Sequence, residues 1–284
     1  MFLTYLKIIA AFLTLAIVAA SSAVIYRIYE RQIQPTLIAQ QSIEQIADSV
    51  QPQVDLGIRD YNTAVALIRA GEMEKALVPL KEIITRYRDS AYFNAARRIV
   101  GEHNVDTLLS RDPMQGKTEY IVQRGDSFSR IASRTNSTVG YLLKVNNRMG
   151  LSLQPGEQLI ATPLEFRVVV HTKSKMLELR KDDAFFKIYP LEGIRFPSGT
   201  ASSFDTTIKS KAAFVGSNTV LVDKDSYIGA EKVINLSRNG ISFRHRSSEE
   251  ADDSYFTGVF LSRENVEELV VLLRNGMKVN VRPT

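Results

Sequence analysis

The stretch Tyr-Ile-Val-Gln-Arg-Gly-Asp-Ser-Phe at residues 120–128 decides the fold of the middle of the chain. Its first three residues are of types that favour a short β-strand. Gly125 and Asp126 are turn residues, and Asp126 or Ser127 can cap a helix that contains Phe128. The segment therefore predicts a strand, a tight turn and the start of a helix in quick succession.

The residues that follow complete a small module. Apolar residues at 139, 142, 143 and 145 share one face of a second helix, which ends at Asn146-Asn147. Leu153-Gln154-Pro155-Gly156 then turns the chain into a last strand, Gln158 to Ala161. The predicted order is strand, helix, helix, strand, in a module too small to bury a large core of its own.

These motifs resemble the LysM domain from Tyr120 to Pro163 without a gap. LysM domains bind N-acetylglucosamine units of peptidoglycan or chitin in a shallow groove between two loops. An acetamido group needs a main-chain donor, a main-chain acceptor and an apolar wall, and no charged catalyst. The alternative is that the first loop serves only as a turn and a helix cap. Transferred by position, the candidate glycan-binding residues are Gly125, Asp126, Ser127, Phe128, Met149, Gly150, Leu151, Ser152 and Leu153.

After Pro163 the apolar residues alternate with a period of two, which predicts a mostly β region. Near its end, Ser262 can cap an amphipathic helix, which Asn275-Gly276 stops before a last strand at 278–281. The other strands are predicted at 166–170, 176–180, 184–189, 212–214, 219–222, 233–236 and 241–244.

The opening strands and the closing segment from Leu261 resemble the L,D-transpeptidase (YkuD-type) catalytic domain, roughly from Phe166 to Val281. Enzymes of that family attack a peptidoglycan stem peptide with a cysteine thiolate, which an upstream histidine assists and an arginine follows. In an alignment without gaps, Gly258 stands at the nucleophile, Ser242 at the histidine and Phe260 at the arginine. The resemblance therefore implies an enzyme fold whose functional positions are all replaced.

The absence of cysteine from the whole chain supports this interpretation, because no shift of the alignment can restore a thiolate. It also excludes disulfides and thiolate metal sites. We therefore expect a non-catalytic domain with no cofactor, and the three widely spaced histidines predict no metal site. The alternative is a wall transpeptidase or hydrolase with an unrecognised serine nucleophile, for which Ser247, Ser248 and Ser254 are the nearby candidates.

The N-terminal part contains two further patterns. Ile8 to Tyr26 carries no charged residue and would span ~28 Å as a helix, enough to cross a bilayer. A membrane anchor is the prediction, with a cleaved signal peptide or a buried core helix as alternatives. Tyr61 to Arg88 resembles one tetratricopeptide-like repeat, and a third helix is expected from Ser90 to Leu109. A single repeat buries its own face poorly, which favours a spacer or a partner-docking bundle over a peptide-binding solenoid.

Composition adds exclusions. Hydrophobic residues make up 44% of the chain and charged residues 24%, which argues against whole-chain disorder and a multi-pass membrane protein. The net charge of +5 suits anionic partners but is spread along the chain. Basic and aromatic residues do not gather on one element, so nucleic acid is not an expected partner.

Together these patterns predict an α+β multi-domain protein. The expected parts are a transmembrane anchor or signal (1–30), a linker or stalk (31–57), a tetratricopeptide-like helical segment (58–111), a βααβ LysM module (118–164) and a mainly-β transpeptidase-like domain (165–284). The expected function is non-catalytic binding of peptidoglycan glycan strands. We expect a single-pass protein of the bacterial inner membrane, held by Ile8 to Tyr26 with its bulk in the periplasm, and an envelope protein as a further partner.

Overall fold

The computed structural model describes residues 55–284 except 223, 225–226, 228, 239 and 247–255, and Leu56–Thr284 form one compact unit. No helix in this described part is long and apolar enough to cross a membrane. Even the long helix at 93–109 carries charged residues, such as Arg97 and Glu102, along its length. The predicted anchor Ile8 to Tyr26 lies outside the described residues, as does most of the linker 31–57.

Two predictions are therefore corrected. The fold class with a transmembrane helix becomes a mixed α+β fold, with a curled β-sheet and no membrane-spanning helix among the described residues. The localisation as a single-pass inner-membrane protein fails on the same finding. The physical reason is that every described helix is short or has a charged face.

Three helices open the described chain: α3 (Gly57–Arg69), α4 (Met73–Arg86) and α5 (Phe93–Leu109). Small side chains allow them to pack closely, since Ala64, Ala76 and Ala96 are fully buried. The third helix begins three residues later than predicted, because the Ser90 hydroxyl accepts a hydrogen bond from the Tyr92 amide and forms a turn there.

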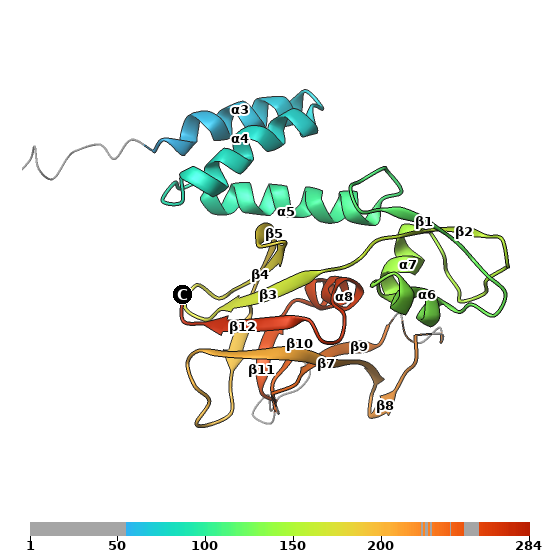
Figure 1. The fold of residues 1–284 in the computed structure, drawn as a ribbon. Helices are drawn as coiled ribbons and strands as arrows, with labels where there is room; N and C mark the ends of the chain where they lie inside the picture. Colours follow the sequence, from blue (N-terminus) through green and yellow to red (C-terminus); the bar gives the residue numbers. More distant parts are fainter. Residues whose placement is uncertain (1–54, 223, 225–226, 228, 239, 247–255) are drawn as a thin grey trace, which may run out of the picture. The chain divides into compact units, whose positions relative to one another are not determined.

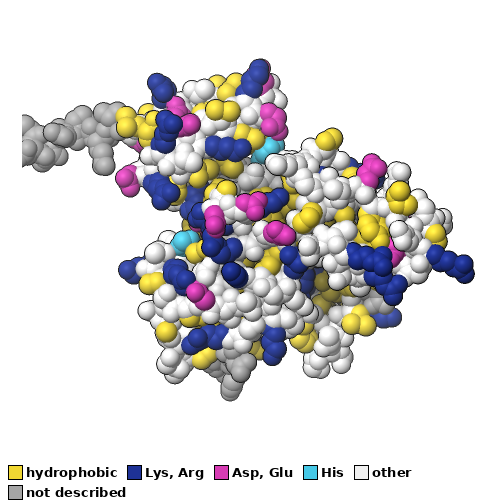
Figure 2. Space-filling model, viewed as in Figure 1, with side chains coloured by type: hydrophobic (Ala, Val, Ile, Leu, Met, Phe, Trp, Pro, Cys, Tyr) yellow, Lys and Arg dark blue, Asp and Glu magenta, His cyan; other side chains and the backbone are white. Residues whose placement is uncertain are grey.

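The helix α5 lies against β5 (Ala184–Pro190) of the C-terminal sheet (Figure 1). Gly101 allows this approach, because a Cβ at that position would lie 3.0 Å from Lys187 Cγ. Asn104 Nδ2 donates to the Phe186 carbonyl oxygen at 2.7 Å. Figure 2 shows acidic and basic side chains together over this junction. The helical segment is thus fixed to the sheet.

The predicted βααβ order is present in β1 (Thr118–Ile121), α6 (Phe128–Arg134), α7 (Val139–Val145) and β2 (Gln158–Ala161). The two strands pair antiparallel, with Ile121 opposite Gln158. Both helices start at a hydroxyl cap: Ser127 Oγ accepts from the Arg130 amide and Thr138 Oγ1 from the Tyr141 amide.

The C-terminal region is one ten-stranded mixed sheet, in which the end strand β12 lies between β3 and β7. The helix α8 (Arg263–Leu272) packs against β9 and β10. Its Ser262 cap is confirmed, since the hydroxyl accepts from the Asn265 amide. The remaining strands are β3 (Phe166–His171), β4 (Met176–Lys181), β6 (Gly193–Arg195), β7 (Phe204–Val215), β8 (Asn218–Thr219), β9 (Glu231–Leu236), β10 (Ser242–His245), β11 (Gly258–Leu261) and β12 (Lys278–Arg282).

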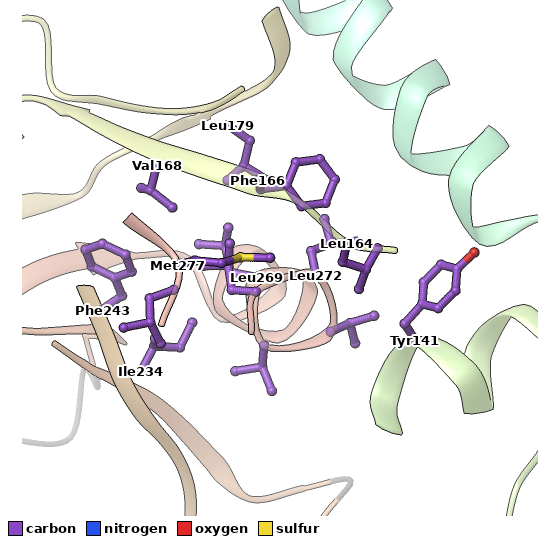
Figure 3. Packing of buried hydrophobic residues seen from close by; sticks show 14 of the residues in the cluster. Tyr141, Leu164, Phe166, Val168, Leu179, Ile234, Phe243, Leu269, Leu272 and Met277 are labelled. Atoms are coloured by element: carbon purple, nitrogen blue, oxygen red, sulfur yellow. The ribbon is translucent and has the colours of Figure 1, made fainter. Parts of the chain in front are cut away.

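One hydrophobic core joins the βααβ module to this sheet. Tyr141 of α7 belongs to the same buried cluster as Phe166 of β3 and Leu272 of α8 (Figure 3). The three N-terminal helices have a second cluster of their own. Sharing a core relieves the shortage of buried surface that limits a module of this size.

The C-terminal end of α8 is where the module docks. A helix end leaves its last carbonyl groups without partners inside the helix. Here Thr138 Oγ1 of the module donates to the Val271 carbonyl oxygen, and Lys211 Nζ of β7 donates to those of Val270 and Leu273 at 2.8 and 2.7 Å. Burial lowers the pKa of Lys211 to about 8. Side chains from both regions thus complete one helix end.

Replacing Thr138 tests this docking. Thr138→Ala removes a helix cap and also leaves the Val271 carbonyl buried without its partner, so we expect a loss of about 2–3 kcal/mol in the free energy of unfolding. Ser127→Ala is the matched control, because it removes only a cap at an exposed site and costs about 1 kcal/mol. If urea denaturation shows that Thr138→Ala and Ser127→Ala lose the same unfolding free energy, Thr138 does not help to dock the module on α8.

Candidate functional site

The first loop of the module is organised by Asp126, one of the predicted glycan-binding residues. Its carboxylate accepts hydrogen bonds from the Tyr120 hydroxyl at 2.8 Å, the Gln123 amide at 2.9 Å and Arg134 Nη1 at 2.9 Å. Only 3% of its side chain is exposed. The main-chain hydrogen bond from Gln123, followed by the hydrogen bond from Tyr120 and the charge of Arg134, lowers the pKa of this carboxyl group. Asp126 therefore holds the turn and does not offer its carboxylate to a ligand.

Two arginines that the sequence analysis did not single out support the same loop. Arg130 donates to the Gly125 carbonyl oxygen, and Arg134 binds both Tyr120 and Asp126. The signal for them is their spacing of four residues, which places Arg130 and Arg134 on one side of α6, just after the turn that holds Asp126.

The second loop is held by Arg148. Its guanidinium donates to the Ser152 carbonyl oxygen at 2.7 Å and pairs with Glu157 at 2.9 Å. Among the backbone N–H and C=O groups of residues 149–153, only the Ser152 carbonyl has a partner in the described chain. The loop thus has a fixed base and an open main chain.

Val122 brings the two loops together. Its amide donates to the Glu157 carbonyl oxygen, and its carbonyl accepts from the Gly156 amide, both at 2.8 Å. Leu151 and Leu153 lie half-buried against the cluster that contains Phe128.

The nine predicted glycan-binding residues therefore fall into two groups. Phe128, 2% exposed, belongs to the core, and the Asp126 side chain is enclosed by its own loop. Met149 is fully exposed, and Leu151 and Leu153 present partly exposed apolar surface. The remaining positions, Gly125, Ser127, Gly150 and Ser152, are exposed. The open main chain and the apolar surface coincide in the second loop.

The three transferred catalytic positions lie on neighbouring strands. Ser242 and Gly258 are register partners in the parallel pair β10 and β11, and Phe260 is buried two residues further along β11. Gly258 has a φ of +145°, and a Cβ there would lie 2.1 Å from the Ser242 carbonyl oxygen and 2.8 Å from its amide nitrogen. No side chain fits at position 258 in this backbone. The alternative candidates Ser247, Ser248 and Ser254 lie outside the described residues.

A hydroxyl, an imidazole and a carboxylate do line up elsewhere. Thr284 Oγ1 is 2.6 Å from His171 Nδ1, and His171 Nε2 is 3.2 Å from Glu178 Oε2. An acyl-transfer site also needs free N–H donors for the oxyanion. Here the nearby amides of Lys173 and Ser174 both donate to the carbonyl of Thr284 itself, at 3.2 and 3.1 Å. The arrangement therefore fastens Thr284 to the turn between β3 and β4.

The module with these two loops is a LysM domain: the family model described as "LysM domain" matches residues 120–162. This confirms the resemblance seen in the sequence and indicates binding of glycan of the peptidoglycan type. The two loops of the described site both lie within the matched residues. No curated protein matches the chain.

Among solved structures, the chain is similar to L,D-transpeptidases. One from Stackebrandtia nassauensis has 18% identity and a TM-score of 0.30, over 42% of this chain and 57% of that one. One from Mycobacterium smegmatis has 13% identity and a TM-score of 0.29, over 46% and 65%. One from Enterococcus faecium has 10% identity and a TM-score of 0.29, over 64% and 81%. The match covers less than two-thirds of the length of the S. nassauensis and M. smegmatis proteins. Their enzymatic activity is therefore stated of those proteins alone.

Proposed function

We propose that this chain is a non-catalytic peptidoglycan-binding protein of the cell envelope that recognises N-acetylglucosamine-containing glycan through its LysM domain. The observation that carries the proposal is the open main chain of residues 149–153 within that domain. Unpaired amides and carbonyls can bind the acetamido groups of the sugar, and Leu151 and Leu153 can receive the methyl groups. The second loop would make the main contacts, with Gly125 and Ser127 at the edge.

The non-catalytic part of the proposal rests on two observations. The chain has no cysteine, and the position that the family resemblance assigns to the nucleophile is a glycine packed against Ser242. A side chain there could not form an acyl intermediate without displacing a strand. An envelope protein as a further partner, expected from the sequence, stays a prediction.

Gly150 offers a sharp test of glycan binding. Gly150→Pro removes the amide donor, whereas the control Gly150→Ala keeps it, and a Cβ at this position has no atom within 4 Å. In co-sedimentation of the full chain with purified sacculi, we expect Gly150→Pro to bind about tenfold more weakly and Gly150→Ala to bind like the unchanged protein. Equal binding by both variants would refute the assigned contact, and no sedimentation of the unchanged protein would refute glycan binding.

The same protein tests the absence of catalysis. Incubation with sacculi and soluble muropeptides, followed by mass spectrometry, should reveal no new cross-link, no cleavage product and no acyl adduct on the protein. Any of these products that grows with protein concentration would favour the enzyme alternative.

A further inference from the structure

A pocket of about 440 Å³ lies in the C-terminal sheet, away from the LysM domain loops and from Ser242 and Gly258. The ends of β7, β9 and β10 and the first turns of α8 line it. Its residue from β10 is His245, the last of that strand, whereas Ser242 is the first. The pocket therefore opens at the opposite end of β10 from the transferred catalytic positions.

Carboxylates form one part of the lining. Glu231 Oε1 accepts from Arg244 Nη2 at 2.6 Å, and Glu267 Oε1 accepts from Lys232 and Arg263, both at 3.4 Å. The second oxygen of each carboxylate has no hydrogen bond within the described chain. Two acceptors therefore remain for a ligand that bears an ammonium group.

Cationic and imidazole groups form another part. Arg263 uses Nη2 to donate to the Gly229 carbonyl oxygen at 2.7 Å and Nε to reach Glu267, while Nη1 has no partner among the described residues. His245 Nδ1 donates to the Leu261 carbonyl oxygen at 3.2 Å, so the unprotonated Nε2 is an acceptor for a donor group of the ligand. The guanidinium of Arg263 suits a carboxylate, to which its Nη1 can donate a charge-assisted hydrogen bond.

The charges of the lining select the class of ligand. Glu231 and Glu267 would repel a ligand with only a negative charge, and Lys232 and Arg263 would repel a ligand with only a positive charge. A molecule with one charge of each sign satisfies both sets. Phe214 and Val266 add an apolar wall, and the volume lies in the range of small-molecule sites, ~300–1,000 Å³.

We propose that this pocket binds a small zwitterion, an amino acid or a dipeptide, with its carboxylate on Arg263 and its ammonium group on Glu231 and Glu267. The site adds a peptide-sized ligand to the proposed glycan-binding function and does not depend on it. Recognition would use both ends of the ligand at once, so blocking either end should weaken binding.

Ligand-observed NMR on the full chain tests the proposal with L-alanyl-L-alanine as the probe. We expect saturable binding of the free dipeptide, and about tenfold weaker binding of its N-acetyl form and of its C-terminal amide. No saturable binding of the dipeptide up to about 10 mM would overturn the proposal, since such affinity is negligible for a formed site. Equal binding of all three probes would overturn the two-ended recognition.

Variants locate the site. Arg263→Gln should weaken dipeptide binding about tenfold, and Glu231→Gln should weaken it while keeping the shape of the side chain. Arg59→Gln, at a side chain 86% exposed on α3, is the control and should change nothing. Sacculus binding of all three variants should equal that of the unchanged protein, which separates this proposal from the glycan site. Undiminished dipeptide binding by Arg263→Gln and Glu231→Gln would overturn the assignment.

Discussion

Replacing Gly258 with alanine is expected to cost about 4 kcal/mol of the free energy of unfolding, a large share of the ~5–15 kcal/mol that is typical of folded proteins. Two effects add. A φ of +145° is a conformation that residues with a side chain rarely adopt, and the new Cβ would lie 2.1 Å from the Ser242 carbonyl oxygen. Gly258 of β11 and Ser242 of β10 are register partners in a parallel pair of strands. Neither residue can therefore move away from the new Cβ without disturbing the pairing of the two strands.

A matched variant separates the two effects. Gly276 also has a positive φ, +85°, but a Cβ there meets no atom within 4 Å. Gly276→Ala should therefore cost only about 1 kcal/mol, the price of backbone strain without a clash. Urea denaturation of both variants measures the difference. If Gly258→Ala is no more destabilising than Gly276→Ala, the packing of Gly258 against Ser242 does not exclude a side chain.

This packing bears directly on the proposed absence of catalysis. Gly258→Cys would restore the residue type that the transpeptidase resemblance places there, yet the sulfur could not be accommodated without shifting β11. Ser242, where that resemblance expects a histidine, contributes its main chain to the contact. The two positions that the resemblance assigns to the cysteine and the histidine therefore fit each other, and Gly258→Cys should give an unstable protein with no acyl adduct.

The local elements were largely predictable from the sequence, because caps and periodicity act over a few residues. Ser127 and Ser262 start helices as expected, and the first three strands after Pro163 lie where the alternation of apolar residues predicted them. The short strands β6 and β11 were not predicted as strands. Three or four residues carry too little periodicity, and their pairing partners lie far along the chain.

The docking of elements could not be predicted, because it depends on contacts between distant residues. Thr138 caps a helix of its own module, and its hydroxyl also donates to the Val271 carbonyl oxygen at the end of α8. Similarly, Asp126 was a candidate ligand-binding residue because it lies in the right loop, whereas its carboxylate is used by Tyr120, Gln123 and Arg134. Position in a loop predicts proximity to a site, and only the hydrogen bonds show which groups remain available.

The second large loss of stability is expected from a substitution where α5 packs against the sheet. Arg97 of α5 and Glu178 of β4 form an ion pair at 2.6 Å, with 12% and 9% of their side chains exposed. Arg180 and His171 also bind the Glu178 carboxylate, at 3.1 and 3.2 Å. The Arg97 guanidinium lies over the ring of Phe185, 5.0 Å from its centroid. Removing one partner leaves a charge that is nearly buried.

We therefore expect Arg97→Met to cost about 3 kcal/mol, because it breaks a buried pair and removes packing on an aromatic ring. Arg98→Met, at the exposed neighbour on α5, is the control and should change stability by less than about 0.5 kcal/mol. The double variant with Glu178→Gln should lose less than the sum of the single losses, by about 2 kcal/mol. Additive losses in urea denaturation would show that the pair does not couple α5 to the sheet.

The pH dependence provides an independent measurement on the same carboxylate. Burial raises the pKa of Glu178, but the hydrogen bond from His171 and the charges of Arg97 and Arg180 outweigh it, so the pKa lies below its ordinary value of 4.5. A carboxyl group with a lowered pKa in the folded state stabilises the fold fully above the unfolded value and loses this contribution as the pH falls through the folded value. The difference in unfolding free energy between the unchanged protein and Glu178→Gln should therefore be constant above about pH 5 and shrink below pH 4.5. In the unfolded chain a glutamate with its ordinary pKa is mostly protonated at pH 3. A difference in unfolding free energy that stays the same down to pH 3 would therefore mean that the charge of Glu178 does not hold α5 on the sheet.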